Sequence, residues 1–146
     1  MSRSFDGVND NVNMGNTNDV TTGSLSLAGW VYEITTGQTM FGKRAGATTA
    51  NAGYHIVGKA GGGCSWRVGD GVVQVLRNVN VNAQNSWVFY CGTYDGGTDV
   101  STVYRNGVFV SNTVAALASL TNTGSFVCGE NAAGGADFNG FEAFVQ

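Results

Sequence analysis

Apolar and polar residues alternate with a period of two in several short segments of this chain. The clearest is residues 24–33, with the sequence SLSLAGWVYE. Such alternation is typical of a β-strand with one buried face. The face predicted to lie in the core holds Leu25, Leu27, Gly29 and Val31. The opposite face holds Ser26, Ala28, Trp30 and Tyr32.

Further short segments of this kind are separated by turn residues. They are residues 39–43, 53–58, 65–78, 86–94, 101–105, 108–112, 125–129 and 141–146. No window has a sustained helical period, and residues 113–120, the closest match, are too few for a stable helix. About nine short strands without helical crossovers predict an all-β, antiparallel β-sandwich or jelly roll. We expect a single domain over residues 1–146.

The Asn106-Gly107 pair predicts a two-residue β-hairpin, because these residues readily take the two positive φ angles of a type I′ turn. The turn would join residues 101–105 to 108–112. The register expected from this turn pairs Arg105 with Val108, Tyr104 with Phe109 and Val103 with Val110.

The composition agrees with a turn-rich β protein. The 146 residues include 23 Gly and no Pro, and 42% are apolar while only 12% are charged. The net charge is −3 and the seven Lys and Arg residues are scattered, so no basic stripe favours nucleic acid as a partner. No apolar run approaches the roughly 20 residues that span a bilayer, and no secretion signal is found at the start. From this we expect a protein made in the cytoplasm.

Three cysteines, Cys64, Cys91 and Cys128, are an odd number without metal-ligand spacing. This argues against a disulfide framework and against a zinc site. We expect them to be small buried apolar residues.

The order of motifs resembles the laminin G-like, concanavalin A-like jelly-roll family over nearly the whole chain. The matching segments are SFDGVNDNVNMG, SLSLAGWVYE, TMFGKRAG, GYHIVG, NSWVFYCGTYDGG, VYRNGVFV, SFVCGENAAGG and FNGF. Two positions depart from the family pattern: Asn11 replaces a tyrosine, and residues 141–145 replace a closing Ile-Asp-Glu-Val. The fold expectation is unchanged, because the last strand stays apolar.

The resemblance also suggests a role for the Asn- and Asp-rich opening. It implies that Phe5 anchors the first strand in the core, that residues 6–10 form a tight turn, and that Val12 and Met14 resume the strand. Asp and Asn suit such turns because their side chains bond nearby backbone groups.

A metal site is not expected. An EF-hand loop counted from Asn9 would have Met14 and Val20 where Gly and Glu are required. Some members of the family bind calcium through acidic residues, so calcium held by Asp6 or Asp10 is kept as an alternative. The two departures from the family pattern count against it.

An enzyme is not expected either. Glycosidases need two carboxylates held close together, whereas Glu33, Glu130 and Glu142 are isolated in sequence. His55, the sole histidine, has no nucleophile or acid beside it in sequence and is interpreted as a strand-face residue. A glycosidase is kept as a third hypothesis, to be tested by replacing these glutamates.

A binding function fits the sequence better. The resemblance implies recognition of glycans or proteins, and sugars are bound by aromatic rings flanked by amides and carboxylates. The candidate binding residues are Trp30, Tyr32, Tyr54 and Trp66. The alternative is that Trp30 and Tyr32 merely cover the second sheet.

Two functional hypotheses follow. A domain that begins at Met1, ends on its last strand and keeps free thiols suggests a bacteriophage virion surface subunit, such as a capsid decoration or fibre-tip protein. It would be made in the host cytoplasm, bind capsid or tail proteins and form a homo-oligomer, with a trimer as one candidate. The alternative is an extracellular carbohydrate-binding, lectin-like module, with or without calcium.

Overall fold

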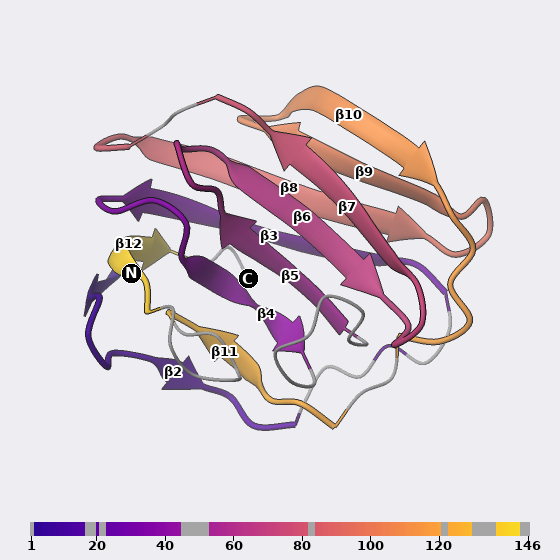
Figure 1. Cartoon of the computed structure of the whole chain (residues 1–146), viewed down its shortest axis with the longest axis horizontal. Helices are drawn as coiled ribbons and strands as arrows, with labels where there is room; N and C mark the ends of the chain where they lie inside the picture. The colour runs from indigo at the N-terminus through magenta and orange to yellow at the C-terminus, as the bar shows by residue number, and fades with distance from the viewer. Residues whose placement is uncertain are drawn as a thin grey trace.

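The computed structural model shows two antiparallel sheets packed face to face (Figure 1). It describes residues 2–16, 20, 23–44, 53–81, 84–120, 123–129 and 137–143. Sheet A has the order β1-β12-β3-β8-β9-β10, and sheet B has the order β2-β11-β4-β5-β6-β7. The predicted antiparallel β-sandwich is confirmed. Within the described residues, no helix has the length and apolar character needed to cross a bilayer.

The strands are short and follow the predicted segments closely. Those of sheet A are β1 (Ser2–Asp6), β3 (Leu25–Glu33), β8 (Trp87–Asp95), β9 (Val100–Arg105), β10 (Val108–Val114) and β12 (Asn139–Ala143). Those of sheet B are β2 (Val12–Asn13), β4 (Thr39–Arg44), β5 (Gly53–Gly58), β6 (Cys64–Gly69), β7 (Gln74–Val79) and β11 (Phe126–Cys128).

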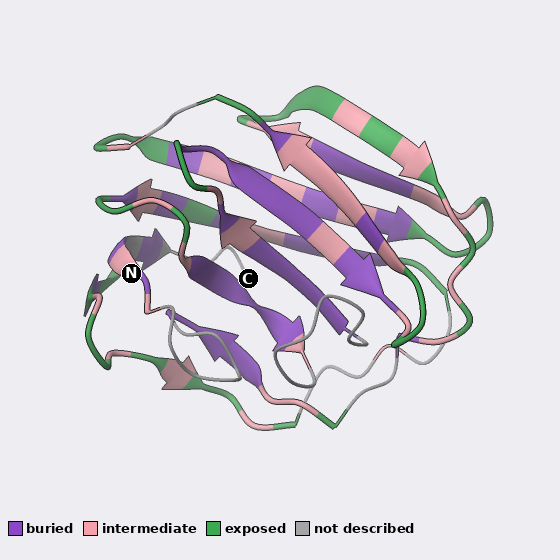
Figure 2. Cartoon of the chain, in the orientation of Figure 1, coloured by how far each residue is buried: buried purple, intermediate pink, exposed green. Residues whose placement is uncertain are grey.

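The core lies between the sheets and follows the predicted alternation on β3. Leu25, Leu27, Gly29 and Val31 are buried, whereas Ser26 and Trp30 are exposed. Strand β8 alternates in the same way, and Figure 2 shows these banded strands behind sheet B. Burial of one face of each strand is the main driving force for such a sandwich, at about 25 cal/mol per Å² of apolar surface.

The Asn- and Asp-rich opening is a crossing between the two sheets. Phe5 is buried in the core, as predicted, and the Val8 amide donates to Asp6 Oδ1 over 2.8 Å. The Asp6 amide in turn donates to Asp10 Oδ2 over 3.1 Å. The chain then continues as β2 in sheet B rather than along β1, so the predicted turn exists but the strand it resumes lies in the opposite layer.

Residues 65–78 form two strands, not the single segment we predicted. Strands β6 and β7 pair with each other across a tight turn. The turn is fixed by Asp70 Oδ1, which accepts hydrogen bonds from the amides of Val72 and Val73. An Asp that bonds the backbone two residues ahead is a standard turn former, so the Asp70-Gly71 pair was the missed signal.

The hairpin at Asn106-Gly107 forms as expected, with both residues at positive φ. The pairs Arg105–Val108 and Tyr104–Phe109 are confirmed, but Val103 pairs with Ser111 instead of Val110. A β-bulge between Phe109 and Ser111 inserts one residue and shifts the register. Bulges of this kind leave no signature that turn length alone could reveal.

Candidate functional site

The structure separates the four predicted binding residues into two pairs. Trp30 and Tyr32 lie on the outer face of sheet A, and Trp30 is 40% exposed. Sheet B packs against the opposite face of β3, so the alternative that these two rings cover the second sheet is wrong.

Tyr54 and Trp66 lie in the core instead. Tyr54 is 4% exposed and Trp66 is completely buried. The Trp66 indole donates a hydrogen bond to Ser101 Oγ over 3.0 Å, which links sheet B to sheet A through the interior. In this structure neither ring can be reached by a ligand at the surface, so the candidate site is reduced to Trp30 and Tyr32 and their neighbours.

Strands β3 and β8 together form a lane along the outer face of sheet A. The cross-strand pairs along this β3–β8 lane are Ser26–Thr93, Ala28–Cys91, Trp30–Phe89 and Tyr32–Trp87. The first pair and the last are six residue steps apart along β3, which corresponds to about 20 Å. The lane has aromatic side chains at one end, small side chains in the middle and hydroxyl groups at the other end.

The aromatic end holds two packed ring pairs. Trp30 and Phe89 have ring centroids 5.4 Å apart, and Tyr32 and Trp87 have centroids 5.8 Å apart in an edge-to-face arrangement. Trp87 is 42% exposed, so each pair presents an indole to solvent. Rings fixed by such cross-strand contacts lose little freedom when a ligand stacks on them.

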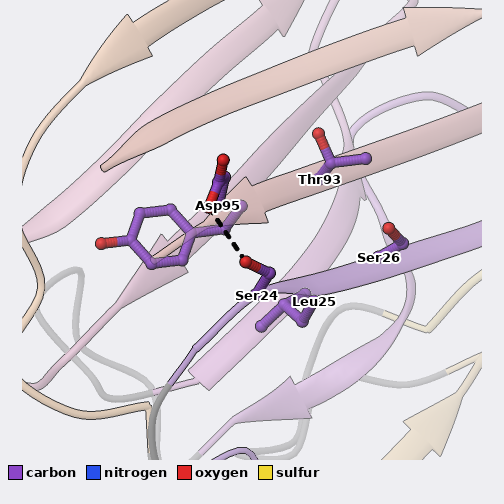
Figure 3. Close-up of a pocket in the computed structure, with 6 residues that line it drawn as sticks. Ser24, Leu25, Ser26, Thr93 and Asp95 are labelled. Carbon is purple, nitrogen blue, oxygen red and sulfur yellow. Dashed lines mark hydrogen bonds between the residues drawn. The ribbon is translucent and has the colours of Figure 1, made fainter. Parts of the chain in front are cut away.

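The hydroxyl-rich end opens into a hollow of about 410 Å³ lined by Ser24–Ser26 and Thr93–Asp95 (Figure 3). Ser24 Oγ donates to Asp95 Oδ1 over 3.1 Å. The Gly97 amide also donates to Asp95, over 2.9 Å, and chiefly lowers the pKa of that carboxyl. Asp95 is therefore a fixed, ionised acceptor beside the hydroxyls of Ser26 and Thr93.

Sequence analysis missed Trp87 and Phe89. The signal was present, because the segment SWVFYCGTY places Trp87, Phe89 and Cys91 on one face and Val88 and Tyr90 on the other. The burial of β8 follows this alternation. What the sequence did not reveal is that β8 pairs with β3 in the register that sets these rings opposite Trp30 and Tyr32.

The cysteines match their predicted role in part. Cys64 and Cys128 are buried, Cys91 is half-buried in the lane, and all three thiols are free. Burial raises the pKa of the Cys64 and Cys128 thiols. These two thiols therefore stay protonated and unreactive at neutral pH.

Two of the three glutamates lie nearer to each other than the sequence suggested. Gly140 pairs with Glu33 and Glu142 with Val31, which places both carboxyls diagonally on the inner face of sheet A. They are 3% and 1% exposed, and burial raises the pKa of each. Enclosed in this way, they have no access to a glycosidic bond. Glu130 lies outside the described residues.

No group of three or more His, Cys, Asp or Glu side chains within the described residues is arranged to hold a metal ion. The carboxylates of Asp6 and Asp10, the pair kept for a calcium alternative, accept backbone hydrogen bonds in the crossing turn.

Comparison of the fold with solved structures finds close likeness over almost the whole chain. Domains LG4-5 of the mouse laminin α1 chain match with a TM-score of 0.71 and 14% identity, over 97% of this chain and 38% of that one. The CBM40 of the Ruminococcus gnavus IT-sialidase, bound to α2,3-sialyllactose, matches with a TM-score of 0.69 and 9% identity, over 97% and 89%.

The native heptameric SAP-like pentraxin from Limulus polyphemus also matches, with a TM-score of 0.64 and 13% identity, over 97% of this chain and 72% of that one. No curated protein sequence matches the chain. The sequence model of the concanavalin A-like lectin/glucanases superfamily matches residues 6–144. With its two-sheet sandwich and its ordered motifs, this chain belongs to the concanavalin A-like lectin/glucanases superfamily.

Proposed function

We propose that this protein binds carbohydrate through the β3–β8 lane. One observation carries the proposal: two aromatic pairs, each with an exposed indole, lie on the same outer sheet face as a hollow lined by hydroxyls and a fixed carboxylate. Carbohydrate binding is the alternative hypothesis of the sequence analysis, and it is better supported than the virion subunit. Such a protein would act outside the cell, where saccharides are displayed.

The two ends of the lane match the two kinds of group on a sugar, its apolar C–H groups and its hydroxyls. A pyranose ring has C–H groups that pack on an aromatic face, and Trp30 and Trp87 offer such faces. Its hydroxyls need partners of both kinds, and Ser26, Thr93 and Asp95 provide donors and acceptors. A lane of about 20 Å accommodates a short oligosaccharide rather than a single sugar.

The comparisons support the same class of ligand. The R. gnavus CBM40, whose fold this chain shares over 97% of its length, is bound to sialyllactose. At 9% identity the likeness concerns the fold, so the ligand of this chain is argued from the lane itself.

A glycan array followed by titration calorimetry tests the proposal. We expect one or more neutral oligosaccharides to bind, and Trp30→Ala and Trp87→Ala to weaken that binding by about tenfold or more, because each removes a stacking face. Phe109→Ala is the matched control, since this exposed ring lies on β10, outside the lane. An array without any bound glycan, or equal affinity in all three variants, would refute the proposal.

A second candidate is self-assembly, as expected for the structural subunit predicted from the sequence. One feature favours it: β10 is an edge strand whose exposed residues include Val108, Phe109, Val110 and Val114. Exposed apolar edge strands tend to pair with another chain. None of the relatives described above is a virion protein, so capsid or tail partners rest on the sequence argument alone.

Size-exclusion chromatography with light scattering separates the two candidates. If β10 mediates assembly, the wild-type protein elutes as an oligomer and Val110→Lys converts it to a monomer, because a charge on the edge blocks strand pairing. Trp30→Ala leaves the oligomer intact. A wild-type protein that is monomeric at high concentration rules out the second candidate.

A further inference from the structure

A second hollow lies on the opposite side of the molecule, on the outer face of sheet B. It has a volume of about 400 Å³ and lies where the ends of two loops meet strands β6 and β7. Its lining residues are Gly37, Gly58, Lys59, Ala60, Ser65, Arg67, Leu76 and Asn78. This volume falls within the range of small-molecule sites.

The register of sheet B shows why these side chains converge. Arg67 pairs with Leu76 and Ser65 pairs with Asn78, whereas Trp66 between them points into the core. The four side chains therefore share the outer face of β6 and β7 in two adjacent rows. The regular sheet therefore forms one wall of the hollow, and Gly37, Lys59 and Ala60 add a second wall from two loops.

The hollow carries positive charge. Arg67 and Lys59 line it, and neither forms an ion pair with a carboxylate among the described residues. The Lys59 ammonium donates to the Asn80 side-chain oxygen, whereas Nε of Arg67 is buried without a hydrogen-bond partner. Two positive charges therefore stand at the hollow without a carboxylate partner among the described residues, which favours an anion as its ligand.

His55 lies next to Arg67 on this face. It pairs directly with Arg67 across β5 and β6, is 3% exposed, and has no hydrogen-bond partner at either ring nitrogen. Burial, followed by the guanidiniums of Arg44 and Arg67, lowers the pKa of His55 to about 3. The ring is therefore neutral at pH 7, and the positive charge on this side of His55 comes from the two guanidiniums.

The remaining lining residues suit a sugar ring. Ser65 is 1% exposed and its hydroxyl donates to Asn78 Oδ1 over 2.7 Å, which leaves the Asn78 amide free to donate toward the hollow. Leu76 provides an apolar contact beside Arg67. A cation, an amide donor and an apolar wall next to one another match a saccharide that carries an acidic group.

We propose that this hollow binds the carboxylate of an acidic saccharide. Arg67 is the main contact, because a guanidinium matches a planar carboxylate with two parallel hydrogen bonds. Lys59 contributes a second positive charge, and Asn78 bonds a sugar hydroxyl. That the carboxylate is carried by a sugar rests on the proposed function, whereas the anion site itself lies on the other sheet from the β3–β8 lane.

The test is an NMR titration of the ¹⁵N-labelled protein with trigalacturonic acid, which carries carboxylates, and with neutral galactotriose. We expect the acid to shift the Nε–H signal of Arg67 and the amide signals of β6, and the neutral trimer to leave them unchanged. Inorganic sulfate is added in a separate titration, because an equal response to sulfate would show a site for free anions rather than for a sugar carboxylate and would overturn the proposal.

Arg67→Gln is the decisive variant. We expect it to weaken trigalacturonate binding by about tenfold or more, the effect of losing a charge-assisted hydrogen bond. Arg3→Gln removes the same charge from β1 and is expected to bind as the wild type does. Circular dichroism checks that both variants are folded. No binding to the wild type, or equal binding by Arg67→Gln, would overturn the proposal.

The test of the sheet B hollow can succeed or fail independently of the test of the β3–β8 lane. Trp30→Ala should lose neutral oligosaccharides yet keep trigalacturonate. If Arg67→Gln loses trigalacturonate binding but no neutral oligosaccharide binds the lane, the sheet B site is supported and the proposed function is refuted. If neutral oligosaccharides bind the lane but Arg67→Gln binds trigalacturonate as the wild type does, only the sheet B site is refuted.

Discussion

The two sheets of this sandwich expose their outer faces to different degrees. Strands β3 and β8 of sheet A alternate between buried residues and half-buried or exposed ones along their whole length, whereas β4, β5 and β6 of sheet B are buried at almost every position (Figure 2). A strand that is covered on both faces loses its period-two signal. The contrast explains why one tryptophan, Trp30, is available to a ligand while another, Trp66, holds the sheets together.

The largest effect should come from Trp66. Trp66→Ala removes a completely buried indole and its hydrogen bond to Ser101. We expect a loss of about 3–5 kcal/mol of stability, in the range for buried aromatics. Urea unfolding measures it, and Trp66→Phe, which keeps most of the volume, should lose less. If Trp30→Ala destabilised the protein equally, the contrast between the sheets would fail.

The second prediction concerns the inner face of sheet A, where Glu33 is buried. Burial raises the pKa of Glu33 from 4.5 to about 7. Between these values the folded state binds a proton that the unfolded state does not, so stability falls as pH rises through this window. Glu33→Gln should therefore stabilise the protein by roughly 2–3 kcal/mol at pH 8.

At pH 5 the same variant serves as its own control, because Glu33 is then protonated in the folded state and the difference should be small. Glu142 is shifted in the same direction and leaves the variant with some of the pH dependence. A stability difference that is constant from pH 5 to pH 8 would show that Glu33 is not the group responsible.

The third prediction tests how tightly the inner faces of the two sheets pack against each other. A Cβ added at Gly92 on β8 would lie 2.1 Å from Cδ2 of Trp66, far inside contact distance. Gly92→Ala should therefore destabilise the protein by about 1–3 kcal/mol through overpacking. Gly97→Ala is the matched control, because the nearest atom there is Asp95 Oδ1 at 3.3 Å. Thermal melting of the two variants provides the comparison.

The smallest effect is expected on the outer face of sheet A. Trp87→Ala loses one cross-strand ring contact with Tyr32, which contributes less than about 1 kcal/mol. We expect its melting temperature to stay near that of the wild type while saccharide binding falls. A large loss of stability would mean that the aromatic pairs serve the fold rather than a ligand.

The contrast between the sheets also explains which sequence predictions held. Alternation on β3 predicted its core face residue by residue, because the outer face of that strand meets solvent. In GYHIVG and SWRVG almost every residue is buried, so the sequence did not reveal that Tyr54 and Trp66 point inward. An alternating sequence pattern identifies the buried face of a strand only where the other face is exposed to solvent.

The candidate site was only half predictable for a different reason. Trp30 and Tyr32 followed from one strand, but their partners Trp87 and Phe89 come from a strand more than 50 residues away. Pairing between distant strands depends on topology and register, which a single sequence does not specify. The same holds for Arg67 and His55, whose neighbourhood exists only once β5 and β6 are paired.

The strand order has a consequence for the timing of assembly. β12 inserts between β1 and β3, and β11 inserts between β2 and β4, so the earliest strands of both sheets find their partners among the latest. On the ribosome, β1 and β2 therefore wait unpaired until residues 126–143 have been translated. Closing such long chain loops is slow, and we expect the nascent protein to need shelter from aggregation until its final strands emerge.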